Sequence, residues 1–226
     1  MTQSEASVSF DAAGHADLHT SFNKLLIQNC LEYGLTDRVT LFAIPAFVDA
    51  RVTPASGVAA KITDTSLEAG ARLLLLGRAG KLSLQASYKT AGAFDLSVST
   101  GRNSGSQAEL RLLYGTGFRL FGRDGFADIQ VAQRWIQRPR PDETPIDLTA
   151  GLWITKSVML MAQSFNIVSD GDAGAPYTYY RSHKLELSVT QKLSRHWSIQ
   201  VGTFYSPAGQ NALTERGVQI SLWTQD

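Results

Sequence analysis

Hydrophobic and polar residues alternate along much of the chain, most clearly between Leu185 and Tyr205. In the first half of this stretch Leu185 and Leu187 fall on one face, whereas Lys184 and Glu186 fall on the other. A tight turn follows, and the alternation then resumes. A period of two residues places successive side chains on opposite faces of a strand. The stretch therefore predicts a β-hairpin with one apolar and one charged face.

The same unit recurs along the chain. Strands are expected over residues 4–10, 23–33, 39–51, 66–77, 81–90, 107–120, 126–138, 146–154, 158–168, both halves of 185–205, and 217–223. The connections alternate between short turns and longer loops, and 139–145 is expected to be a loop because it is rich in proline. Pro45 lies inside a predicted strand and suggests a bulge or an unpaired N–H position. The tally is about twelve antiparallel strands, and an even number is typical of bacterial outer-membrane barrels.

Alternation alone does not tell which face is the interior, because a soluble sandwich buries the apolar face that a membrane barrel turns to lipid. Two features favour the barrel. Charges of both signs occupy mid-strand positions of the polar face, and aromatic residues gather near both ends of the strands. We therefore expect residues 1–226 to form a single domain, an all-β, closed, antiparallel, up-and-down transmembrane β-barrel. Leu185, Leu187 and Val189 should face lipid, with Lys184, Glu186 and Lys192 in the lumen.

Composition narrows the remaining possibilities. The 226 residues carry a net charge of only +1, which gives no general reason to expect a nucleic-acid partner. The single cysteine, Cys30, forms neither a disulfide within the chain nor a zinc motif. Asp170 and Asp172 lack the further ligands of a calcium loop and are expected to lie in a turn. No cofactor, metal or catalytic residue is predicted.

Several motifs carry a resemblance to a known family. The segment Glu32-Tyr33-Gly34-Leu35-Thr36-Asp37-Arg38 resembles a first-hairpin signature of Gram-negative outer-membrane barrels, including phenol meta-pathway proteins. Later segments occur in the order found in XagA-like barrels: 111–115, 141–143, 147–149, 163–166, 182–185 and 211–217. The resemblance implies an outer-membrane location, contact with outer-membrane lipid and a link to surface polysaccharide. It defines no activity.

Polar residues expected on the inner face are the candidate site. They are Arg72, Glu109, Arg111, Arg134, Asp147, Gln163, Asn166, His183, Lys184, Glu186, Glu215 and Arg216. Rows of charge and hydrogen-bonding groups inside a barrel indicate a channel or accessory pore for a small solute or a polysaccharide. An interior closed by salt bridges is the alternative, since about twelve strands enclose a narrower lumen than a porin. The protein would then be a structural or adaptor barrel for envelope secretion machinery.

A second alternative is a lipid-active hydrolase. His19, Ser21 and Asn23 are the residue types that outer-membrane phospholipases use. A nucleophilic serine needs a base within hydrogen-bond reach, but same-face neighbours on one strand lie roughly 6–7 Å apart. The spacing therefore argues against this function.

Overall fold

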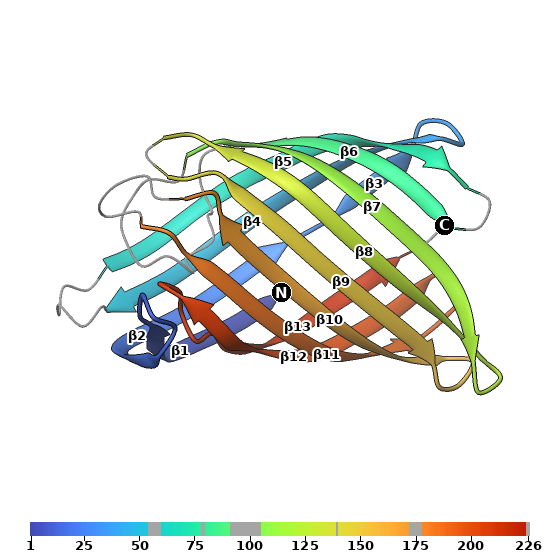
Figure 1. Ribbon diagram of the computed structural model, residues 1–226. Coiled ribbons are helices and arrows are strands. Elements are labelled where there is room, and N and C mark those ends of the chain that lie inside the picture. Colours follow the sequence, from blue (N-terminus) through green and yellow to red (C-terminus); the bar gives the residue numbers. More distant parts are fainter. Residues whose placement is uncertain (54–59, 78–79, 91–104, 139, 172–177, 225–226) are drawn as a thin grey trace.

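The computed structural model describes residues 1–53, 60–77, 80–90, 105–138, 140–171 and 178–224. Within these ranges the chain is a closed antiparallel β-barrel (Figure 1). Its strands are β1 (Thr2–Phe10), β2 (Ala16–Gln28), β3 (Leu31–Gly34), β4 (Val39–Thr53), β5 (Ala60–Leu76), β6 (Lys81–Lys89), β7 (Gln107–Leu120), β8 (Arg123–Ile136), β9 (Glu143–Trp153), β10 (Val158–Ser169), β11 (Arg181–Lys192), β12 (Trp197–Gln210) and β13 (Arg216–Thr224). No helix in the described ranges is long and apolar enough to cross a membrane.

The strands follow one another around the barrel in chain order. β2 and β3 both pair with β4, so together they occupy one strand position in the barrel wall. The described strands fill twelve such positions. The barrel closes where β1 pairs with β13 through four residue pairs, Thr2–Gln219 to Glu5–Arg216. The predicted closed up-and-down barrel of about twelve strands is confirmed.

Short turns after β3, β7, β9 and β11 lie at one end of the barrel, here called the turn rim. The reversals from β1 to β2 and from β12 to β13 lie at the opposite end, here called the loop rim. In outer-membrane barrels short turns face the periplasm and longer loops face outward.

Three prolines lie at positions where the pairing between two neighbouring strands is interrupted. Pro45 lies opposite the break between β2 and β3, and its carbonyl accepts a hydrogen bond from Asn29 N at 3.1 Å. Pro145 pairs with β10, but the ladder from β9 to β8 has a gap at this position. Pro207 lies within the register shift between β11 and β12. A proline has no N–H to donate, so these sites tolerate it. The prediction of an irregularity at Pro45 is confirmed.

Some predicted boundaries were wrong. β2 begins at Ala16 instead of residue 23, and β5 begins at Ala60 instead of residue 66. β9 begins at Glu143, inside the predicted loop 139–145, because the gap in its ladder accommodates Pro145. β12 continues to Gln210, beyond the predicted end at Tyr205, because the register shift between β11 and β12 accommodates Pro207.

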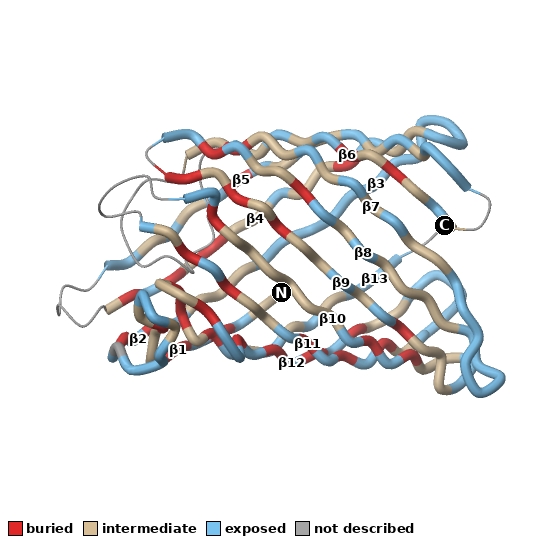
Figure 2. The backbone as a smooth tube through the Cα atoms, viewed as in Figure 1, coloured by how far each residue is buried: buried red, intermediate tan, exposed pale blue. Residues whose placement is uncertain are grey.

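The apolar face of the strands is the outside of the barrel. Leu185, Leu187 and Val189 are 39%, 65% and 45% exposed, whereas Glu186 between them is 5% exposed. Exposed and buried positions alternate along the middle of β11 and β12 (Figure 2). A sandwich would bury those leucines, so the predicted assignment of the two faces is confirmed.

The aromatic residues divide between the two faces. Outward-facing rings that remain exposed include Tyr33 and Trp197 near the turn rim and Trp135 and Tyr205 nearer the loop rim. Four other rings were expected near the two ends of the strands, at the membrane interfaces, but face inward instead, as their partner residues on the neighbouring strands do: Phe126, Trp153, Phe165 and Trp223. Fewer aromatic rings therefore face outward near the two rims than the sequence predicted.

Some inward-facing phenylalanine rings lie against glycines of a neighbouring strand, for example Phe42 against Gly70 and Phe126 against Gly151. A Cβ added at Gly70 would lie 2.7 Å from Cζ of Phe42, and one at Gly151 would overlap the ring of Phe126. The missing side chain of each glycine thus makes room for the neighbouring ring.

Candidate functional site

The inner wall on β7, β8 and β9 carries a continuous ladder of ion pairs. Arg111 contacts Glu109 at 2.7 Å and Asp147 at 2.6 Å. Arg134 contacts Glu109 at 2.8 Å and extends the ladder to the loop rim. Because residues opposite one another in an antiparallel pair share a face, alternation along three adjacent strands brings these groups together.

The ladder ends in a buried group at the loop rim. Glu143 contacts Arg134 at 2.7 Å and Arg140 at 3.1 Å, and its other neighbour is Tyr180, whose hydroxyl donates a hydrogen bond to it. Burial, followed by the negative charge of Glu143, raises the pKa of the Tyr180 hydroxyl, which keeps it a neutral donor. Ser169 Oγ accepts the N–H of Tyr180 at 2.9 Å. These bonds tie the connection after β10 to the connection before β9.

The ladder is balanced in charge. Three arginines (Arg111, Arg134 and Arg140) contact three carboxylates (Glu109, Glu143 and Asp147). Each carboxylate therefore has at least one cationic partner, which is what enclosed ionic groups require. The predicted candidates do not include Glu143, Arg140 and Tyr180, and the first two fall in the proline-rich stretch 139–145 that was expected to be a loop.

A second charged group lies on the facing wall. Glu215, which precedes β13, contacts Lys24 of β2 and Lys184 of β11, each at 2.7 Å. Ser4 of β1 donates a further hydrogen bond to it. Two ammonium groups thus share one carboxylate, and a second carboxylate, Glu186, occupies the next inward-facing position after Lys184 on β11.

The wall on β5 and β6 completes the circumference. Arg72 contacts Glu32 of β3 at 2.9 Å and Gln85 at 3.0 Å, and Ser87 donates a hydrogen bond to Glu68 at 2.8 Å. Glu68 of β5 lies directly opposite Lys89 of β6 in the pairing of these two strands, so opposite charges lie beside one another here as well.

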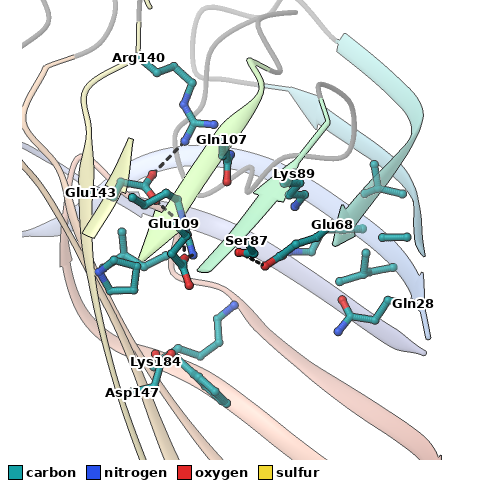
Figure 3. Close-up of a pocket in the computed structure, with 18 residues that line it drawn as sticks. Gln28, Glu68, Ser87, Lys89, Gln107, Glu109, Arg140, Glu143, Asp147 and Lys184 are labelled. Carbon is teal, nitrogen blue, oxygen red and sulfur yellow. Dashed lines mark hydrogen bonds and ion pairs between the residues drawn. The ribbon is translucent and has the colours of Figure 1, made fainter. Parts of the chain in front are cut away.

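These three walls enclose a cavity of about 330 Å³ inside the barrel. Figure 3 shows Glu109 and Glu143 on one side of it, Glu68 and Lys89 on another, and Lys184 reaching toward it from a third. Apolar side chains complete the lining: Leu26, Ala46, Val48, Pro145, Phe165 and Ile167. A volume of this size is at the lower end of what small-molecule sites in proteins occupy.

An apolar cluster narrows the lumen beside this cavity. It consists of buried residues near the loop rim: Ala6, Phe22, Val48, Ala50, Val52 and Leu213. Leu213 belongs to the connection between β12 and β13, which is held against β1 by the hydrogen bond from Phe10 N to Ala212 O at 2.7 Å. Part of the outer mouth is therefore filled by the chain itself.

The structure places nine of the twelve predicted candidates on the inner face. They are Arg72, Glu109, Arg111, Arg134, Asp147, Gln163, Lys184, Glu186 and Glu215. Gln163 and Glu186 lie opposite one another and toward the turn rim from the cavity. Glu186 accepts a hydrogen bond from Gln219 of β13.

The other three lie on the outer face, so their expected inward placement was wrong. Asn166 and His183 are paired across β10 and β11 at 2.8 Å and share their face with Leu185. Arg216 shares its face with Val218 and contacts Glu5 of β1 at 2.8 Å. Polar side chains are tolerated on the outer face near the loop rim, where a strand passes the lipid headgroups.

The residues of the hydrolase alternative all lie on β2. His19 and Ser21 are both exposed, and no hydrogen bond joins them in the described part of the chain. Asn23 is paired with Glu5 on the outer face. Nor do the described residues contain a group of three or more side chains that could hold a metal ion.

No family model and no curated protein matches the sequence. The fold is nevertheless similar to solved structures. The COG4313 outer membrane channel from Pseudomonas putida F1 has a TM-score of 0.69 at 15% identity, covering 97% of this chain and 92% of that chain. The translocator domain of the autotransporter NalP from Neisseria meningitidis has a TM-score of 0.60 at 12% identity, covering 100% and 86%. The NanC porin has a TM-score of 0.52 at 7% identity, covering 100% of both chains.

At these identities the similarity concerns the fold. The closed wall leaves apolar side chains exposed around its circumference, and in lipid only a closed barrel or a helix satisfies every backbone polar group. The chain is therefore a bacterial outer-membrane β-barrel, in agreement with the location predicted from the sequence.

Proposed function

We propose that the barrel is a narrow, passive channel for small solutes across the outer membrane. The observation that carries the proposal is the cavity of about 330 Å³ inside the closed wall, lined on three sides by fixed charges. Oriented charges and hydrogen-bonding groups along a path replace part of the water that a polar solute loses on entry. A passive role needs neither a cofactor nor a catalytic step.

The fold comparisons support this function. The Pseudomonas putida neighbour is described as an outer membrane channel and the NanC neighbour as a porin. The order of the XagA-like motifs adds a finer proposal, in which the solute is connected with surface polysaccharide. The narrow cavity favours a small saccharide unit or another small solute over a folded polymer.

Single-channel recording of the refolded chain tests the proposal. In planar lipid bilayers with concentrated potassium chloride, we expect discrete current steps of small and uniform size. A matched variant carries Tyr180→Phe, which removes the hydroxyl that ties the two loop-rim connections together. We expect this variant to show larger or noisier steps. A correctly folded barrel that gives no steps at any salt concentration would overturn the channel.

A closed adaptor barrel is the second candidate. It is favoured by the balanced ion-pair ladder and by the apolar cluster, both of which occupy space in the lumen. In this case the interior serves only to close the wall, and the functional surface is outside. Absence of current, together with co-purification of envelope secretion components with the native chain, would support it.

A lipid-active hydrolase remains the least supported candidate. Phospholipid turnover by the refolded chain that is lost in Ser21→Ala and in His19→Ala would support it. We propose that no such turnover occurs.

A further inference from the structure

A second cavity, of about 810 Å³, lies at the turn rim and is here called the turn-rim cavity. Its lining comes from facing parts of the wall. Lys81 at the start of β6 and Trp223 near the end of β13 both line it, and these two strands are far apart in the order around the barrel. The turn-rim cavity therefore crosses the lumen.

A row with two charged residues runs along one side of this cavity. Lys81 of β6 lies opposite Gly115 of β7, and Gly115 lies opposite Asp128 of β8. Residues opposite one another share a face, so Lys81 and Asp128 both face the lumen. A Cβ added at Gly115 would lie 3.6 Å from Oδ2 of Asp128, which places the carboxylate beside the glycine. Because Gly115 has no side chain, the space between the two charged groups is part of the cavity.

The two charged groups are available to a solute. Lys81 and Asp128 are the only charged residues among the described residues that line the cavity. Neither takes part in an ion pair in the described part of the chain, and Asp128 accepts one hydrogen bond, from Gln130 at 2.7 Å. The next carboxylate in the row, Glu186, lies three strands from Asp128 and outside the lining. One cation and one anion thus lie on the same side of the cavity.

An apolar surface lies next to the charged row, toward the turn rim. Phe126 of β8 and Met161 of β10 both lie opposite Gly151 of β9, and the ring of Phe126 lies against this glycine. Phe126 is two residues from Asp128, so it occupies the adjacent position on the same face. The indole ring of Trp223 adds to the apolar lining from the facing wall.

A solute that matches these features has an ammonium, a carboxylate and an apolar part. We propose that the turn-rim cavity binds small zwitterions with an apolar side chain, the chemical class of the amino acids. The ammonium of the solute contacts Asp128, its carboxylate contacts Lys81, and its apolar part lies against Phe126 and Met161. The inference rests on the proposed channel function and names a class of solute that the channel passes. A neutral polyhydroxylated solute fits less well, because it brings no charge to either group.

Binding to the refolded full chain in lipid nanodiscs is measured by ligand-observed NMR, with empty nanodiscs as the reference for partition into lipid. Free phenylalanine is compared with 3-phenylpropanoate, which lacks the ammonium, and with 2-phenylethylammonium, which lacks the carboxylate. Glycine lacks the apolar part, and methyl glucoside is an uncharged polyol. We expect phenylalanine to bind about threefold to fivefold more tightly than either singly charged analogue, as for ion pairs that water reaches. Equal binding of the three phenyl compounds would overturn the proposal, as would equal binding of glycine or tighter binding of methyl glucoside.

Two variants of the charged row test the assigned contacts. Asp128→Asn should weaken binding of phenylalanine and 2-phenylethylammonium about threefold to fivefold and leave 3-phenylpropanoate unchanged. Lys81→Gln should weaken phenylalanine and 3-phenylpropanoate and leave 2-phenylethylammonium unchanged. Misfolding cannot produce this crossed pattern, because it would affect all three compounds alike. A uniform loss in folded variants would overturn the assigned contacts.

Matched controls remove the same charges outside the lining. The ammonium of Lys192 lies 4.1 Å from the ring centre of Trp153, and Asp124 contacts Arg119 at 3.4 Å. Lys192→Gln and Asp124→Asn should both leave the affinities unchanged, and losses equal to those of the site variants would contradict the position of the site. Selective binding without current would refute the channel and keep the site, whereas current without selective binding would do the reverse.

Discussion

Glu215 contacts Lys24 at 2.7 Å across β1, the strand that lies between β13 and β2. The same carboxylate accepts a hydrogen bond from Ser4 of β1. β1 joins β13 through only four residue pairs. The side-chain contacts of Glu215 therefore reinforce the place where the barrel closes.

Glu215→Ala should strongly destabilise the barrel, because it leaves two lysines without their enclosed counterion. Loss of one partner of a buried ion pair costs about 3–5 kcal/mol. Urea unfolding in lipid vesicles, followed by the electrophoretic shift of the folded barrel, measures the change. The control is Glu5→Ala, which breaks the exposed pair with Arg216 on the outer face and should cost less than about 1 kcal/mol. Equal effects of the two variants would argue against reinforcement by Glu215.

Arg111→Gln should shift the ion preference of the channel toward cations. The substitution leaves the carboxylates of Glu109 and Asp147 without this guanidinium. The reversal potential across a bilayer with a salt gradient gives the preference. Arg216→Gln removes the same charge from the outer face and should leave the potential where it was. A shift of equal size in both variants would mean that Arg111 does not act from the lumen.

Gly151→Ala should destabilise the barrel by about 1–3 kcal/mol, because the added methyl group overlaps the ring of Phe126. A second substitution, Phe126→Ala, should relieve most of this overlap, so the two changes together should be less harmful than their sum. At Gly70 the added Cβ also overlaps the carbonyl oxygen of Ala86, which belongs to the backbone. Truncation of Phe42 should therefore not rescue Gly70→Ala. Double-mutant unfolding cycles compare the two sites.

Leu187→Arg should cost about 2–4 kcal/mol in lipid vesicles, because Leu187 lies near the middle of β11 on the outer face. Leu193→Arg, just beyond the turn-rim end of β11, should cost about 0–1 kcal/mol, since an arginine there reaches the interface. Unfolding free energies that do not depend on this depth would argue against the position of the wall in the membrane.

The alternation of side chains predicted the strands, and the mid-strand charges and the aromatic residues near the strand ends were needed to assign the two faces. The same alternation, applied strictly, would also have placed His183 outside, because it is two residues from Leu185. Arg216 likewise stands two residues before Val218. Both residues were nevertheless predicted to face the interior, because they are polar. Near the loop rim, polarity is a weaker guide to the face than position along the strand.

Other parts of the site could not be predicted from the pattern. Glu143 was not predicted to lie in a strand, because Pro145 follows it closely. The gap in the pairing of β8 with β9 that accommodates this proline can be seen only in the structure. The partners of Glu215 come from β2 and β11, which are distant in sequence. Which inward-facing charges meet depends on strand register, and a pattern of period two does not contain the register.

The closure between β1 and β13 has a consequence for the order of assembly. Ser4 and Glu215 are separated by 211 positions in sequence, and Lys24 meets its counterion only when β13 is in place. Contacts of such long range form late, because a large loop must be ordered before they are gained. The N-terminal strands therefore have an open edge and an uncompensated lysine until synthesis has passed residue 216. We expect the chain to depend on chaperone protection until its final strand is available, and to enter the bilayer as a whole.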